Sequence, residues 1–157
     1  MDRIYFDNNA TTPLDPAVCE TMLPYLQERF GNPSSGHRDG EQALFGITNA
    51  REQVATLLTS QPKRILFTSG GTEANNTAIW SAVSAFPEKK HIVSSVVEHA
   101  SVLKPLEFLQ QRFGYKIDLL PVSRDGALDL QLLAETIGPD TILVSLMAAN
   151  NESGVVW

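Results

Sequence analysis

The chain has 157 residues, of which 43% are hydrophobic and 19% are charged, and its formal net charge is -6. This length allows one domain with a substantial core, and the composition is that of an ordinary soluble globular protein. The negative charge argues against nucleic acid or an acidic membrane surface as the main partner, and no apolar run is long enough to span a bilayer. We therefore expect a cytoplasmic protein with no nucleic-acid or membrane partner.

The first part of the sequence predicts two helices separated by loops. Pro16 suits the first turn of a helix that would end at Gly31, and a long helix is expected over residues 37–58. Each helix has an apolar stripe at helical spacing, which predicts a buried face. The stripes are formed by Val18, Met22, Leu26 and Phe30 in the first helix and by Leu44, Ile47, Val54 and Leu58 in the second.

Cys19 is the single cysteine, so no disulfide can form within the chain. It lies on the first predicted helix, where a lone cysteine is most often a small buried apolar side chain. A nucleophilic cysteine needs an electropositive setting, and the neighbouring Glu20 supplies the opposite charge. We therefore expect Cys19 to be buried rather than reactive.

From residue 63 onward, strand and helix patterns alternate along the chain. Strands are predicted at 64–68, 91–95, 116–121 and 141–147, and helices at 72–86, 101–113 and 129–137. Each helix has an apolar stripe, formed in the second of them by Val102, Leu106, Leu109 and Phe113. This alternation predicts an α/β fold, with a mainly parallel sheet and helices on both of its faces. In such sheets ligands bind beyond the carboxyl ends of the strands, so polar residues that follow the strands are expected to converge.

The turn at residues 69–72, Ser-Gly-Gly-Thr, follows the first of these strands and opens the next helix. The first N–H groups of a helix have no intrahelical partner and carry partial positive charge, so this turn predicts a phosphate site. The spacing excludes a nucleotide P-loop, because Thr72-Glu73 stands where Lys-Ser or Lys-Thr is needed, and no third glycine completes a dinucleotide-binding turn. The alternative is a tight turn capped by Ser69 or Thr72, with no ligand.

Polar residues follow two further predicted strands. His99 precedes a helix that Ser101 is expected to cap, and Asn150 and Asn151 follow the last strand. An imidazole can stack on a planar ring and shuttle a proton near neutral pH, and an amide can hydrogen-bond a ring oxygen. The alternatives are a helix-capping histidine and turn-forming asparagines. Together with a phosphate site at residues 69–72, these residues predict a site for pyridoxal phosphate. Residues 124–126, which follow the third predicted strand, predict only a turn.

Five blocks of sequence resemble the NifS/IscS-type cysteine desulfurases, the class V branch of the fold-type I pyridoxal-phosphate enzymes. The blocks are residues 5–13, 30–35, 67–76, 98–99 and 150–156. The resemblance implies that Gly71 and Thr72 contact the cofactor phosphate and that His99 stacks on the pyridine ring as a catalytic residue. It implies that Asn151 bonds the phenolic oxygen of the cofactor, and it implies no metal site.

The resemblance also implies how the chain is organised and what the family does. Residues 1–15 correspond to an N-terminal segment near the active site, and residues 16–157 to an incomplete pyridoxal-phosphate-binding large domain. The family converts L-cysteine to L-alanine and keeps the sulfur as an enzyme-bound persulfide for iron–sulfur cluster assembly. The implied partners are a second copy or a complementing C-terminal chain, and an iron–sulfur scaffold protein that accepts the sulfur.

In the family, the Schiff-base lysine, the carboxylate at the ring nitrogen and the persulfide cysteine follow the last of these blocks. None of the five lysines in this sequence has the required context. We therefore expect this chain alone to be inactive, with an unpaired sheet edge and uncovered apolar faces. Two alternatives are a non-catalytic remnant or split-enzyme half that acts as a binding or dimerisation module, and another class V member such as a selenocysteine lyase.

Overall fold

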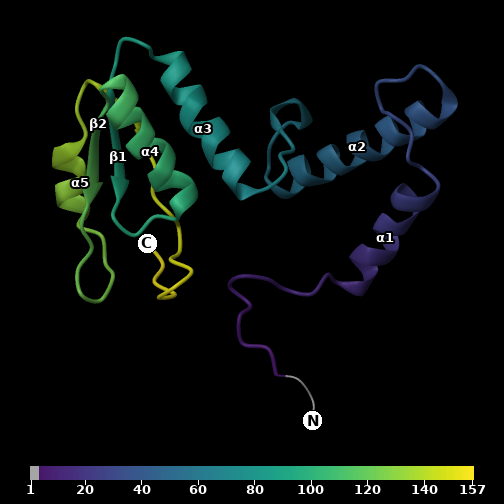
Figure 1. Ribbon diagram of the computed structural model, residues 1–157, viewed down its shortest axis with the longest axis horizontal. Coiled ribbons are helices and arrows are strands. Elements are labelled where there is room, and N and C mark those ends of the chain that lie inside the picture. The colour runs from purple at the N-terminus through teal and green to yellow at the C-terminus, as the bar shows by residue number, and fades with distance from the viewer. Residues whose placement is uncertain (1–3) are drawn as a thin grey trace. The chain divides into compact units, whose positions relative to one another are not determined.

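The computed structural model describes residues 4–157, which divide into two compact units (Figure 1). The first unit ends at Phe67, and the second runs from Thr68 to Trp157. Residues 1–3 of the predicted N-terminal segment lie outside the described residues. The division into a segment of residues 1–15 and a domain of residues 16–157 remains a prediction.

The first unit consists of two α-helices and a short 3₁₀ helix. α1 (Pro16–Gln27) begins after Asp15, whose carboxylate accepts hydrogen bonds from two first-turn N–H groups at 2.8 and 3.4 Å. α2 spans Arg38–Leu57, and the 3₁₀ helix η1 spans Pro62–Arg64. Both predicted helices are therefore present, although α1 ends before the predicted boundary at Gly31.

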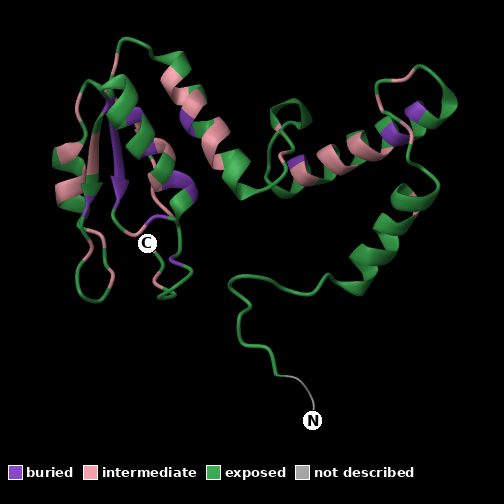
Figure 2. Cartoon of the chain, viewed as in Figure 1, coloured by how far each residue is buried: buried purple, intermediate pink, exposed green. Residues whose placement is uncertain are grey.

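The predicted burial of the α1 stripe is wrong. Val18, Met22, Leu26 and Phe30 are all exposed, and Cys19 is exposed as well. Figure 2 shows α1 exposed along almost its whole length. The physical reason is that an amphipathic stripe is buried only where another layer covers it, and the described part of the first unit contains no sheet.

The small residues of α2 form its buried face. Gly40, Ala43 and Ala55 are buried, whereas the predicted stripe is only partly covered: Ile47 and Val54 are half-buried, and Leu44 and Leu58 are exposed. A further small residue of α2, Gly46, allows α1 to approach closely, because a Cβ atom there would lie 2.6 Å from Cε1 and from the hydroxyl oxygen of Tyr25.

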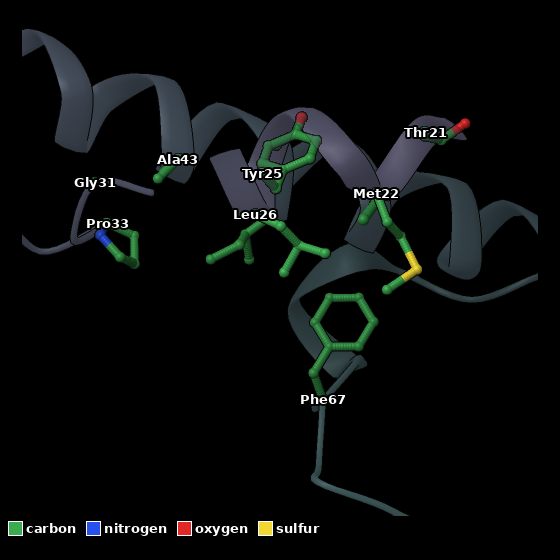
Figure 3. Close-up of a pocket in the computed structure, with 11 residues that line it drawn as sticks. Thr21, Met22, Tyr25, Leu26, Gly31, Pro33, Ala43 and Phe67 are labelled. Carbon is green, nitrogen blue, oxygen red and sulfur yellow. The ribbon is translucent and has the colours of Figure 1, made fainter. Parts of the chain in front are cut away.

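An open apolar pocket of about 420 Å³ lies between the two helices of the first unit (Figure 3). Met22 and Leu26 of α1, Ala43 of α2 and the ring of Phe67 contribute to its wall. The apolar side chains of α1 therefore face a shared hollow rather than a closed core.

Gly40 offers a direct test of the loop that leads into α2. A Cβ atom at this position would lie 2.2 Å from the carbonyl oxygen of Ser35 and 2.7 Å from that of Asn32, and both are backbone atoms. We expect Gly40→Ala to lower the free energy of unfolding by about 2 kcal/mol, as overpacking does elsewhere. Urea denaturation followed by circular dichroism measures this change.

Gly36 provides the matched control, because a Cβ atom there would meet nothing within 4 Å. Gly36→Ala should change the free energy of unfolding by less than about 0.5 kcal/mol. Equal effects of the two substitutions would show that the loop does not pack against Gly40 in solution.

The second unit alternates helices and strands as predicted. Its elements are α3 (Gly71–Ala85), β1 (His91–Ser95), α4 (Ala100–Phe113), β2 (Lys116–Leu120), α5 (Leu130–Thr136) and β3 (Thr141–Val144). The strands form a parallel sheet in the order β2-β1-β3, with His91 beside Lys116 and Ile92 beside Leu143. The predicted α/β fold with a parallel sheet is confirmed.

One predicted strand is wrong and another is shorter than expected. Residues 64–68 form no strand: Ile65 has extended backbone, but no described strand pairs with it, and its carbonyl instead accepts a hydrogen bond from Arg51 Nε at 3.3 Å. Extended backbone becomes a strand only when a neighbour completes the hydrogen-bond ladder. The last strand ends at Val144 rather than at 147, although the N–H of Ser145 still donates to Val93.

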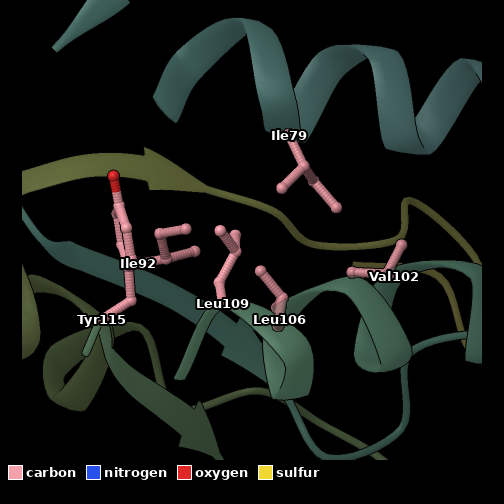
Figure 4. Packing of buried hydrophobic residues seen from close by; sticks show 6 residues of the cluster. All are labelled: Ile79, Ile92, Val102, Leu106, Leu109 and Tyr115. Atoms are coloured by element: carbon pink, nitrogen blue, oxygen red, sulfur yellow. The ribbon is translucent and has the colours of Figure 1, made fainter. Parts of the chain in front are cut away.

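The core of the second unit is formed by α3, β1 and α4 (Figure 4). Its buried members are Ile79 of α3, Ile92 of β1, Val102, Leu106 and Leu109 of α4, and Tyr115. All five residues of β1 are buried, as expected for the central strand of a covered sheet. The predicted stripe of α4 is confirmed, except that Phe113 is half-exposed and meets Trp80 edge-on.

A chain of polar contacts crosses the three strands near the start of β1. Thr141 Oγ1 accepts the N–H of Gly138 at 2.9 Å and lies 2.7 Å from Nδ1 of the buried His91. Nε2 of His91 lies 3.0 Å from a carboxylate oxygen of Asp118, which is also 2.7 Å from Lys116 Nζ. The hydrogen bond from Lys116, followed by that from His91, lowers the pKa of Asp118 below its ordinary value. This chain of contacts links β3, β1 and β2 side by side.

Candidate functional site

The turn before α3 leaves backbone N–H groups without a side-chain cap. Gly70, the residue before the helix, makes no side-chain cap, so the cap by Ser69 or Thr72 that the alternative interpretation required is not formed. Instead, the N–H of Ser69 donates to a carboxylate oxygen of Glu73 at 2.6 Å. The N–H groups at the start of the helix, from Gly71 onward, are the donors that this arrangement leaves for an anion.

The space beside these donors is open. A Cβ atom at Gly70 or Gly71 would meet nothing within 4 Å, so a ligand can approach the backbone closely there. Hydrogen bonds from the side chain and then the backbone of Ser69 lower the pKa of Glu73 below its ordinary value, so its carboxylate is ionised at neutral pH. Because Glu73 engages the N–H of Ser69, the donors that remain for an anion are those at the helix start, which include the N–H groups of Gly71 and Thr72.

His99 caps its own helix. Its Nδ1 accepts the N–H of Ser101 at 3.0 Å and lies 2.8 Å from Oγ of the same residue. The prediction that Ser101 caps α4 is therefore wrong, and the helix-capping alternative for His99 is correct. The reason is backbone geometry: His99 has extended backbone directly before Ala100, where a side-chain acceptor reaches the N–H two residues on.

His99 and Thr72, the last residue of the turn at 69–72, line one pocket. This pocket has a volume of about 560 Å³ and is bordered by Thr72 and Asn76 of α3 and by His99, Lys104 and Phe108. The structure therefore brings together two of the residues that the sequence singled out from separate strand ends. A contact between the helices accompanies this arrangement: Asn75 Nδ2 donates to Ser101 Oγ at 2.8 Å.

The loops that follow β1 and β3 also meet, as the topology predicted. Glu98 is buried, and its carboxylate accepts the N–H of Met147 at 2.6 Å. Asn150 donates to the carbonyl of Val97 at 3.4 Å. Its side-chain oxygen accepts two N–H groups of the following turn, both at 2.9 Å. Asn150 is therefore the turn-forming asparagine of the alternative interpretation.

Asn151 is exposed in the turn that follows Asn150, and it does not line the pocket that contains Thr72 and His99. Its predicted contact with a ring oxygen stays a prediction. Asn75 and Glu98 were not predicted as site residues, although both lie inside the blocks that resemble the family. Their hydrogen bonds join residues that are far apart in the chain, and a local sequence pattern cannot predict such contacts.

The fold and this site define a class of protein. The sequence matches the Aminotransferase class-V family over residues 4–157, and the chain belongs to that family. Cysteine desulfurase 2 of Trichormus variabilis is 49% identical over the whole chain, which covers 39% of that relative. Cysteine desulfurase NifS of Azotobacter vinelandii is 44% identical, and the chain again covers 39% of it.

Solved structures agree with these relatives. A structure titled NifS-like protein superposes with a TM-score of 0.95 and 40% identity over 99% of this chain and 43% of its own. A structure titled SspA in complex with cysteine gives a TM-score of 0.88 and 39% identity over 97% of this chain and 44% of its own. The predicted resemblance to NifS/IscS-type cysteine desulfurases is confirmed, and the chain spans about two fifths of the length of these relatives.

No helix in the described part of the chain is long and apolar enough to cross a membrane. Within residues 4–157, no three His, Cys, Asp or Glu side chains are grouped so that they could hold a metal ion.

Proposed function

We propose that this chain forms the phosphate-binding part of a pyridoxal-phosphate-dependent cysteine desulfurase site. The observation that carries the proposal is the single pocket shared by Thr72 and His99, next to open space at Gly71. Uncapped N–H groups at a helix start suit a phosphate, and an exposed imidazole across the same pocket suits a flat aromatic ring. The residues present therefore fit this cofactor.

Each residue would have a distinct task. The N–H groups of Gly71 and Thr72, with the Thr72 hydroxyl, would hold the phosphate, and the His99 ring would stack on the pyridine ring. Asn151 would bond the phenolic oxygen, a role that rests on the resemblance to the family. Pyridoxal phosphate, when bound, supplies an electron-accepting ring that stabilises carbanions.

The complete reaction is part of the same proposal. L-cysteine would be the substrate, and L-alanine and an enzyme-bound persulfide the products, with an iron–sulfur scaffold protein as the acceptor. The curated relatives described above are named cysteine desulfurases, which favours this reaction over that of a selenocysteine lyase. We place the reaction in the cytoplasm, as the composition predicts.

Turnover would also require the family's Schiff-base lysine and persulfide cysteine. A complementing C-terminal chain is the proposed partner that would supply these residues, and a second copy is the proposed partner in a dimer. The exposed apolar side chains of α1 and the exposed Leu66 support such an association, because they are free to pack against another polypeptide.

Pyridoxine 5′-phosphate is the sharpest probe of the proposed phosphate site. It lacks the aldehyde of the cofactor, so it cannot form a Schiff base with lysines such as the exposed Lys104. We expect the chain to bind it at least tenfold more tightly than pyridoxine in equilibrium dialysis. Thr72→Ala should reduce that preference about tenfold, because a hydrogen bond to a charged group contributes about 1.5 kcal/mol or more.

Ser84→Ala is the matched control for Thr72→Ala. Ser84 lies on the same helix, and its hydroxyl donates to the carbonyl of Trp80, away from the turn. This substitution should leave both affinities unchanged. Equal affinities of the original chain for the two probes would overturn the proposal.

A further inference from the structure

We propose that Ser101, held in place by Asn75, positions the His99 ring so that Nε2 presents an N–H to the pocket. What this N–H meets rests on the proposed function, but the positioning itself does not. His99 is the residue that would touch the cofactor, and Ser101 and Asn75 would act through it as positioning residues.

The direction of the backbone hydrogen bond determines which ring nitrogen of His99 carries the proton. A backbone N–H can only donate, so Nδ1 of His99 must accept in its 3.0 Å contact with the N–H of Ser101. A neutral imidazole carries its proton on the other nitrogen when one nitrogen accepts. Neutral His99 therefore carries its proton on Nε2.

The Ser101 hydroxyl strengthens the same arrangement. The Asn75 amide donates to Ser101 Oγ at 2.8 Å, which leaves the hydroxyl hydrogen to point to His99 Nδ1, also at 2.8 Å. Ser101 is buried and Asn75 is half-buried, so these contacts are shielded from competing water. Buried networks in which every group is paired are rigid.

The hydrogen bonds of Asn75 and Ser101 connect the His99 ring to α3, the helix that begins in the turn at residues 69–72. Asn75 lies on α3, one helical turn beyond Gly71, whereas Ser101 and His99 lie at the start of α4. The hydrogen bonds from Asn75 to Ser101 and from Ser101 to His99 therefore fix the ring relative to the helix whose first N–H groups are the phosphate donors. A ligand that contacts both the His99 ring and the first N–H groups of α3 would therefore find them at a fixed separation.

The chemical consequence concerns the role of His99. With its proton on Nε2, the neutral ring donates a hydrogen bond into the pocket, and it fits an acceptor such as a carboxylate or a ring oxygen. Nε2 cannot take up a further proton, because in the neutral ring it already carries one, and Nδ1 is occupied by the N–H of Ser101. The neutral ring is thus a hydrogen-bond donor, which differs from the proton shuttle that the sequence suggested.

Nuclear magnetic resonance of the full chain without cofactor tests the positioning directly. In alkaline buffer, long-range proton–nitrogen spectra should show Nδ1 of His99 as the acceptor nitrogen and Nε2 as the protonated one. A coupling across the hydrogen bond should link Nδ1 to the backbone nitrogen of Ser101. A proton on Nδ1 would overturn the proposal.

Substitutions separate the side-chain network from the backbone cap. Ser101→Ala and Asn75→Ala should each shift and broaden the His99 ring signals, because the ring loses its fixed orientation, although the backbone N–H of residue 101 still keeps the proton on Nε2. Ser101→Thr, which keeps the hydroxyl, should restore the original signals. Ser84→Ala is the control, and the backbone spectrum shows whether each variant is folded. Unchanged ring shifts in a folded Ser101→Ala or Asn75→Ala chain would contradict the positioning role.

The two proposals can fail separately. Thr72→Ala should weaken binding of pyridoxine 5′-phosphate while leaving the His99 tautomer intact, because Thr72 makes no contact in the network. If the tautomer is as expected but the phosphate probe does not bind, the proposed function fails and the positioning of His99 stands. If the probe binds but Nδ1 carries the proton, the reverse holds.

Discussion

Gly71→Asp should lower the affinity of the chain for pyridoxine 5′-phosphate about 100-fold or more. The new carboxylate would lie at the first residue of α3, where it would occupy the N–H groups that are proposed to bind the phosphate. Two like charges about 4 Å apart repel by about 4 kcal/mol at the effective dielectric of a protein surface, which is more than such a loss requires. Equilibrium dialysis measures the affinity.

Gly71→Ala separates charge from bulk in this experiment. A Cβ atom at Gly71 enters open space, so alanine should change the affinity by less than about threefold. The aspartate variant should keep its helix content in circular dichroism, because an acidic residue in the first turn stabilises a helix. If alanine and aspartate reduced binding equally, the phosphate would not lie at this helix start.

His91→Ala should lower the free energy of unfolding by about 3 kcal/mol. The imidazole is buried and contacts Thr141 and Asp118 on the strands at either side. Its removal leaves a cavity and deprives both side chains of a partner; each of these losses costs about 1 kcal/mol or more. Urea denaturation of the full chain measures the loss.

Lys116→Ala is the control for this effect. Lys116 contacts the same carboxylate of Asp118, but its side chain is 69% exposed. Exposed ion pairs contribute little, so this substitution should cost less than about 1 kcal/mol. A loss for His91→Ala as small as that for Lys116→Ala would mean that the contacts across the three strands do not stabilise the sheet.

Local periodicity predicted the second unit well. The alternation of strand and helix patterns located β1 and β2 closely, and the apolar spacing of α4 identified Val102, Leu106 and Leu109 as core residues. These features depend on the period of each element, which a sequence carries directly. The predicted strand at 64–68 failed because a strand also needs a neighbour, and a neighbour is a property of the whole fold.

In the candidate site, too, local sequence patterns were recognised and contacts between separate elements were not. Turn chemistry singled out residues 69–72, and the position after a strand singled out His99; Thr72 and His99 do line one pocket, and their binding roles remain predictions. The roles of Asn75, Ser101 and Glu98 were missed, because they depend on contacts between separate elements. Ser101 suits a helix cap by its residue type, yet the histidine two positions earlier makes that cap instead.

The most direct test of the phosphate site is an amide titration of the full chain with pyridoxine 5′-phosphate, followed by nuclear magnetic resonance. The largest shifts should fall on the backbone N–H groups of Gly71 and Thr72 and on the ring of His99, with pyridoxine alone producing none at Gly71 or Thr72. Shifts confined to other residues, such as the adjacent pair Lys89 and Lys90, with the N–H signals of Gly71 and Thr72 unchanged, would contradict a cofactor-phosphate site at the start of α3.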